Sequence, residues 1–203
     1  IQNTRELKEV QSRPDDPAEL ARIPRLTRQY LDSEMQQTPR QEHDISQSTL
    51  LFHPQPTAGI FYLDLGFDLH YLPQKYLSYL PLFGRALLEM GTSSRDFVQL
   101  TTWIRQKTGG IAPMTLSQSR LQGDGSSSRL FLRSKALPEN IPDLLDILKD
   151  ILENVNLDNQ ERFRQLVLEE KSGMEHSLIP AGHRFVGMRL KSRYSEADWA
   201  QEH

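Results

Sequence analysis

Apolar and polar residues alternate most clearly between positions 60 and 70. The apolar residues fall at every second position there: Phe61, Leu63, Leu65, Phe67 and Leu69. A period of two over this length predicts a β-strand with one face on a core. Residues 54–59 supply turn chemistry before it, and a weaker alternation over residues 46–53 predicts an earlier strand.

Three- and four-residue spacing of the apolar positions replaces this alternation after Pro73. The spacing predicts a helix over residues 73–90, with Gly91 at its C-terminal cap, and a second helix over residues 95–107. Two strands, 111–121 and 129–137, then flank a run of glycine, aspartate and serine. That run, residues 122–126, predicts a β-hairpin.

The remaining apolar stripes are helical. One covers residues 141–155, and another extends from residue 159 toward residue 194 with an interruption at residues 180–182. The expected order is therefore ββααββαα. This order predicts an α+β fold, in which a mixed or antiparallel sheet carries its helices on one face.

The first 42 residues differ from the rest because they are polar and contain four prolines, with only short helices predicted at residues 5–11 and 17–22. We interpret residues 1–42 as the end of an interdomain linker or helical arm, and residues 43–203 as one α+β domain. The chain begins with Ile1 rather than methionine, and we therefore expect it to be an excerpt of a longer protein.

Composition narrows the function classes. A net charge of −3 gives no electrostatic reason to expect a nucleic acid or an anionic membrane as partner. The absence of cysteine excludes disulfides, thiolate metal sites and a cysteine nucleophile. No apolar stretch approaches the roughly 18 residues that a bilayer-spanning helix requires.

Candidate chemistry in the chain is sparse. The six histidines are His43, His53, His70, His176, His183 and His203. None lies three or four residues from another, so no helical pair of metal ligands exists, and surface or packing roles are favoured. A site assembled by tertiary contact around His176 or His183 stays open as the weaker alternative. No G-x-S-x-G motif is present, and residues 123–128 fit a hairpin turn better than a phosphate loop.

Four sequence words in one order carry a family resemblance: YLDLGFDL at 62–69, LPLFGRALLEMGT at 80–92, DFVQL at 96–100 and KTGGI at 107–111. They resemble the presequence proteases of the pitrilysin/insulinase zinc metallopeptidase family, and specifically the second, non-catalytic half with its peptidase-associated domain. The resemblance implies a non-catalytic domain of a zinc-dependent oligopeptidase that degrades unstructured peptides such as cleaved targeting presequences. It also implies that the domain forms part of a closed proteolytic chamber, with the N-terminal catalytic half of the same polypeptide as partner.

Within that family the catalytic copy of the domain carries the zinc motif H-x-x-E-H on its first helix. Alignment on Gly91-Thr92 puts the two histidine positions at Leu82 and Ala86 and the glutamate position at Arg85. Leucine and alanine offer a metal no lone pair, and arginine cannot act as a base near neutral pH. Glu169 and Glu170 fall near the position of the family's third ligand, and we interpret them as surface or salt-bridge residues. The resemblance therefore implies no catalytic, metal or cofactor residue in this chain, zinc only in the parent enzyme, and no activity for the fragment alone.

Two further expectations follow from the resemblance. The family's domain continues with strands after Trp199, so this chain is expected to be truncated at its C-terminus and to self-associate through exposed apolar surface. The protein is expected in the cytoplasm of a bacterium, or in the mitochondrial matrix or plastid stroma of a eukaryote. The alternative function is a stand-alone module that binds a peptide or protein without protease activity.

Overall fold

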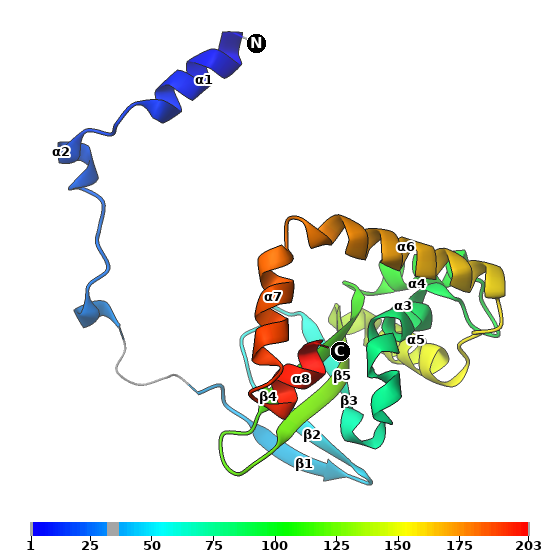
Figure 1. Cartoon of the computed structure of the whole chain (residues 1–203). Coiled ribbons are helices and arrows are strands. Elements are labelled where there is room, and N and C mark those ends of the chain that lie inside the picture. The colour runs from blue at the N-terminus through cyan, green and yellow to red at the C-terminus, as the bar shows by residue number, and fades with distance from the viewer. Residues whose placement is uncertain (1, 32–36, 203) are drawn as a thin grey trace. The chain divides into compact units, whose positions relative to one another are not determined.

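The computed structural model describes residues 2–31 and 37–202, and the chain divides into two compact units between Gln55 and Pro56 (Figure 1). The first unit contains helices α1 (Gln2–Ser12) and α2 (Pro17–Leu20). Asp16 caps α2 by accepting a hydrogen bond of 2.8 Å from the backbone N–H of Ala18. Both predicted short helices are present, and α1 extends beyond the predicted residues 5–11.

The first unit also holds an antiparallel hairpin of β1 (Gln41–Ile45) and β2 (Ser48–Phe52). The sequence predicted one strand over residues 46–53, so the first arm of the hairpin was missed. The turn lies at Ser46, which adopts a φ of 54°, a left-handed conformation that a serine rarely signals in a sequence. The boundary expected between residues 42 and 43 stays a prediction about the longer protein.

The second unit is built on a three-stranded antiparallel sheet with the order β3-β5-β4. Its strands are β3 (Phe61–Asp68), β4 (Ile111–Ser119) and β5 (Ser126–Ala136). Leu132 of the central strand lies opposite Leu65 on one side and Pro113 on the other. The predicted alternation of β3 is confirmed as far as Leu65, because Phe61, Leu63 and Leu65 pack against the core while Tyr62 and Asp64 are exposed. Phe67, which the alternation placed on the core face, is exposed instead.

Helices cover the face of the sheet that carries Leu132. They are α3 (Leu80–Glu89), α4 (Phe97–Lys107) and α5 (Ile141–Glu153). Leu132, Leu100, Leu144, Ile147 and Ile151 have no measurable exposure and form the centre of the main core. The α+β class predicted from the sequence is thereby confirmed. The helix predicted from residue 73 begins as a 3-10 helix at Gln74–Tyr79 and becomes α-helical at Leu80.

Gly91 makes the sharp connection from α3 toward α4. Its φ is 91°, and a Cβ atom there would lie 2.7 Å from the carbonyl oxygen of Arg95, so the position accepts only glycine without strain. The adjacent Thr92 donates a hydrogen bond of 2.9 Å to the buried carboxylate of Asp150 on α5. The end of α3 is therefore fixed to α5.

Three helices complete the second unit: α6 (Gln160–Leu178), α7 (Gly182–Lys191) and α8 (Glu196–Glu202). Helix α6 packs along α3, after which α7 turns back toward the sheet and α8 lies beside β4 and β5 (Figure 1). The predicted interruption at residues 180–182 is confirmed, since α6 ends at Leu178 and α7 starts at Gly182. Helix α8 was not predicted.

Candidate functional site

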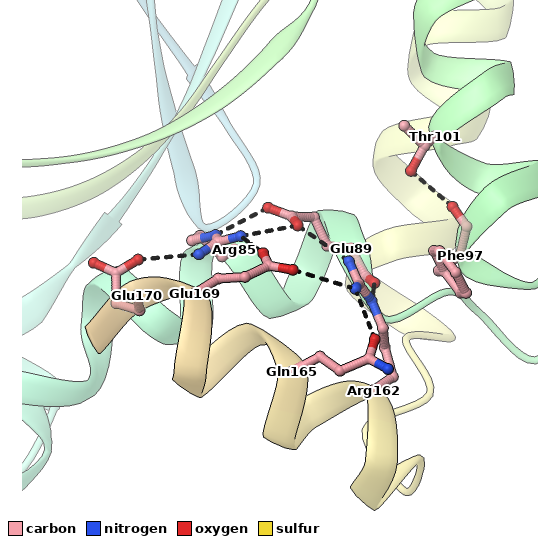
Figure 2. A network of polar contacts seen from close by, with 8 residues as sticks. All are labelled: Arg85, Glu89, Phe97, Thr101, Arg162, Gln165, Glu169 and Glu170. Carbon is pink, nitrogen blue, oxygen red and sulfur yellow. Dashed lines mark hydrogen bonds and ion pairs between the residues drawn. The ribbon is translucent and has the colours of Figure 1, made fainter. Parts of the chain in front are cut away.

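Arg85 lies where α3 meets α6, and its guanidinium contacts three carboxylates (Figure 2). On its own helix it binds Glu89 through two hydrogen bonds, 3.0 Å from Nε and 3.1 Å from Nη2. On α6 it donates to Glu169 over 2.7 Å and to Glu170 over 3.2 Å. One side chain of α3 therefore pairs with both glutamates that the sequence placed near the third ligand position.

A second arginine, Arg162 in the first turn of α6, extends this network. It donates to the backbone carbonyl of Glu89 over 3.0 Å and pairs with the Glu89 carboxylate over 3.3 Å. Its guanidinium carbon lies 4.5 Å from the centre of the Phe97 ring, within the range of a cation–π contact. Arg162 thus holds α6 against the C-terminal end of α3 and the start of α4 (Figure 2).

An apolar cluster lies beside the charged one. Ala86 is 1% exposed and packs with Met90 and the fully buried Leu166 of α6, and the half-buried Leu82 packs against them. The two positions that the resemblance aligned with zinc-binding histidines therefore fill a hydrophobic contact between α3 and α6. Such contact stabilises by roughly 25 cal/mol for each Å² of apolar surface that it removes from water.

The carboxylates of the cluster stabilise the protonated, charged form of Arg85. Hydrogen bonds to Glu89 first, and then to Glu169 and Glu170, raise the pKa of Arg85 further above its usual value, although partial burial acts in the opposite direction. Arg85 therefore remains a cation at every physiological pH. Together Arg85 and Arg162 place two positive charges among three carboxylates, which leaves the cluster with a net charge of −1.

The residues of this cluster do not fit a zinc ion. Zinc requires nitrogen, sulfur or carboxylate ligands in a near-tetrahedral set, and the guanidinium of Arg85 occupies the side of Glu169 and Glu170 that a metal would face. Across residues 2–31 and 37–202, no three histidine or acidic side chains converge in a way that could hold a metal. Of the alternative histidines, His176 contacts the carbonyl oxygen of Ser172 in its own helix over 2.7 Å.

Sequence reasoning placed Leu82, Arg85, Ala86, Glu169 and Glu170 near one another, and the structure brings all five to the contact between α3 and α6. It missed Glu89 and Arg162. Glu89 lies within the family-like segment 80–92 but at none of the positions aligned with the zinc motif, and a helix-terminal arginine is ordinary in any sequence. Only the angle at which α6 crosses α3 makes Arg162 a partner of Glu89.

A second polar contact involves Asp68 at the end of β3 and His70 just after it. The Asp68 carboxylate accepts a backbone hydrogen bond of 3.0 Å from His70 and lies 2.8 Å from the imidazole Nδ1. These two bonds, the backbone one first, lower the pKa of Asp68 below its usual value. Since the carboxyl is more acidic in the folded than in the unfolded chain, the ionised form adds stability above about pH 4. That stability is lost as the pH falls through the folded-state pKa.

Asp68→Asn is therefore expected to lower the free energy of unfolding at pH 6 by less than about 1 kcal/mol, because the carboxylate is about one third exposed. The difference from the unaltered chain should narrow as the pH falls below 4. Urea unfolding followed by the fluorescence of Trp103 and Trp199, both in the second unit, measures it. A difference that stays constant from pH 6 to pH 3 would contradict the assignment.

Comparison with known proteins assigns this chain to a family. A family model for the associated domain of peptidase family M sixteen, subfamily C, matches residues 1–203. The presequence protease 1, chloroplastic/mitochondrial, of Arabidopsis thaliana is 34% identical over 199 residues, which are 98% of this chain and 18% of that protein. Protein HypA of Clostridium perfringens is 29% identical over 96% of this chain and 20% of its own length. The mitochondrial presequence protease of Yarrowia lipolytica is 26% identical over 76% of this chain and 16% of its own.

The chain thus spans about a fifth or less of the length of these curated relatives. No helix in the described part of the chain has the length and apolar character needed to cross a bilayer. The resemblance to presequence proteases read from four sequence words is confirmed by the comparisons, and the match extends over both units. The chain belongs to the family of domains associated with the subfamily C peptidases of family M sixteen.

Proposed function

We propose that this chain is a non-catalytic domain of a zinc-dependent oligopeptidase and forms part of the wall of its closed proteolytic chamber. The observation that carries the proposal is the contact between α3 and α6, where Arg85 binds Glu169 and Glu170 and Ala86 packs on Leu166. A metallopeptidase domain needs ligands and a base at this contact. Here a guanidinium and an apolar cluster hold the same two helices together.

The ligands for zinc and the catalytic base then lie outside residues 1–203, in an N-terminal half of the same polypeptide. The substrates we propose are unstructured peptides, including cleaved targeting presequences, because two of the relatives are named presequence proteases. The compartment follows the organism: the cytoplasm in a bacterium, the matrix or stroma in a eukaryote. When separated from the other half, the chain is expected to self-associate through apolar side chains of the sheet's outer face, such as Tyr62, Met114 and Leu116.

Mixing the two halves tests this function. The catalytic half, produced as a separate polypeptide and loaded with zinc, is expected to cleave an unstructured fluorogenic peptide at least tenfold faster once the 203-residue chain is added. The chain alone should show no turnover with or without zinc. The variant Arg105→Ala, changed on the exposed side of α4, serves as a control and should raise the turnover of the catalytic half as much as the unaltered chain does.

Turnover by the chain alone would overturn the proposal. Peptide binding by the chain without any gain in turnover of the catalytic half would favour the alternative of a stand-alone binding module.

A further inference from the structure

A cavity of about 380 Å³ opens on the helix-covered face of the second unit, away from the cluster around Arg85. One wall is aliphatic and comes from the segment between β3 and α3, with Leu69, Leu72, Leu77 and Leu80. Helix α8 contributes Glu196, Trp199 and Ala200 to the lining. The sheet contributes the floor. The cavity therefore combines an apolar body with a polar base and a carboxylate.

Ser117 on the floor of the cavity carries an unsatisfied hydroxyl. Its side chain is 1% exposed, and the Oγ atom has no hydrogen-bond partner within the described residues. The backbone carbonyl of Ser117, by contrast, accepts a hydrogen bond of 2.6 Å from the Gln201 side chain. A buried hydroxyl without a partner costs roughly 1–3 kcal/mol. A polar ligand atom that reaches Oγ from the cavity would remove that cost, and this points to such an atom beside Ser117.

The charged side chains around the cavity determine which sign of charge a ligand must carry. Glu196 lines its rim, and its carboxylate oxygen lies 3.4 Å from Nε2 of His70. On the other side of the imidazole, the carboxylate of Asp68 lies 2.8 Å from Nδ1. No lysine or arginine is among the lining residues that the structure describes. Asp68 is not among the lining residues and also pairs with Arg129 over 3.9 Å, so Glu196 is the acidic side chain that the described residues present to the cavity, and its charge favours a cation.

We infer that this cavity binds the side chain of a lysine or arginine from an extended peptide. The methylene stem of such a side chain packs on the aliphatic wall, and the charged end meets Glu196 and the hydroxyl of Ser117. Trp199 adds an aromatic side chain of the kind that cations favour. The inference rests on the proposed function for the source of the ligand, a peptide held beside this domain.

Two peptides that differ in one charge test the inference with the unaltered 203-residue chain. Both are unstructured glycine-serine peptides, one with a central arginine and the other with citrulline, which has nearly the same shape and no charge. The arginine peptide is expected to shift the NMR signal of the Trp199 indole N–H and to bind about tenfold more tightly. The indole signal of Trp103, on α4, should stay in place. Equal binding of the two peptides would overturn the inference.

A pair of matched variants locates the contact. Glu196→Gln is expected to weaken binding of the arginine peptide about fivefold, the half-exposed position reducing the effect, and to leave the citrulline peptide unchanged. Glu153→Gln on the exposed face of α5 should change neither. Equal affinities of the two variants for the arginine peptide would place its cation elsewhere. Because this experiment uses the chain alone, its outcome is separate from whether the chain raises the turnover of a catalytic half.

Discussion

Replacing Arg85 by alanine is expected to lower the free energy of unfolding of the second unit by about 2 kcal/mol at low ionic strength. Among the described residues, the substitution leaves Glu89, Glu169 and Glu170 close together with Arg162, which pairs with Glu89 and Glu169, as the remaining arginine of the cluster. The side chain of Arg85 is 26% exposed, so the loss is smaller than for a fully buried ion pair. Urea unfolding followed by tryptophan fluorescence measures the change.

Salt separates the electrostatic part of this loss from the packing part. The deficit of Arg85→Ala should shrink in high salt, because ions screen the repulsion among the remaining carboxylates. Arg85→Lys should lose about half as much, since it keeps the charge but not the forked geometry that binds Glu89 at two points. Arg105→Ala again supplies the control, with an expected change within about 0.5 kcal/mol. Equal stability of the two alanine variants would show that the network does not hold α6 in place.

Restoring the zinc motif at the three aligned positions, two of them metal ligands, is expected to make the fold depend on zinc. In the variant L82H/R85E/A86H, two imidazoles four residues apart face the carboxylates of Glu169 and Glu170, which the loss of Arg85 has released. One zinc ion should bind per chain. At a zinc concentration about a thousand times the dissociation constant, binding adds about 4 kcal/mol, a rise of roughly 10 °C in Tm. Metal analysis and thermal unfolding with and without a chelator measure both effects.

The matched control for the zinc variant is L82H/A86H, which keeps Arg85. The guanidinium then stays between the imidazoles and the two glutamates and repels a divalent cation, so we expect at least about a hundredfold weaker zinc binding. Equal zinc uptake by the two variants, or none by a triple variant that retains its helical circular dichroism, would mean that the alignment of Leu82, Arg85 and Ala86 with a zinc motif is wrong.

Local patterns of apolar and polar residues sufficed to predict most of the strands and helices of the second unit. The strict alternation of Phe61, Leu63 and Leu65 identified β3, and the glycine-rich run after residue 121 identified the hairpin between β4 and β5. Helix α8 was not predicted because its seven residues make too few turns for a helical period to show in the sequence. The first strand of the first hairpin was not predicted because the turn uses Ser46 in a conformation that sequences usually mark with glycine or asparagine. Both misses are short elements without their own apolar stripe.

Residues of the candidate site could be predicted only where a motif allowed this sequence to be aligned with the family's zinc motif. The alignment on Gly91-Thr92 singled out Arg85, and a rough count along the last long helix reached Glu169 and Glu170. That Arg85 binds all three carboxylates at once depends on how α6 crosses α3, which the pattern of neither helix contains. The cavity beside α8 was invisible for the same reason. Its lining comes from four separate stretches of the chain, in the segment leading into α3, in β4, in β5 and in α8, and these share no spacing.

The strand order of the sheet has a consequence for synthesis on the ribosome. Among the strands that the structure describes, β3 pairs with β5 alone, and the first residue of β5 follows the last residue of β3 by 58 positions. At translation rates of about 5 to 20 residues per second, β3 waits roughly 3 to 12 s for its neighbour. During that time the backbone of β3 is open to pairing with other nascent chains. Asp64 and Asp68 interrupt its apolar sequence with negative charge, which disfavours such pairing until the central strand emerges.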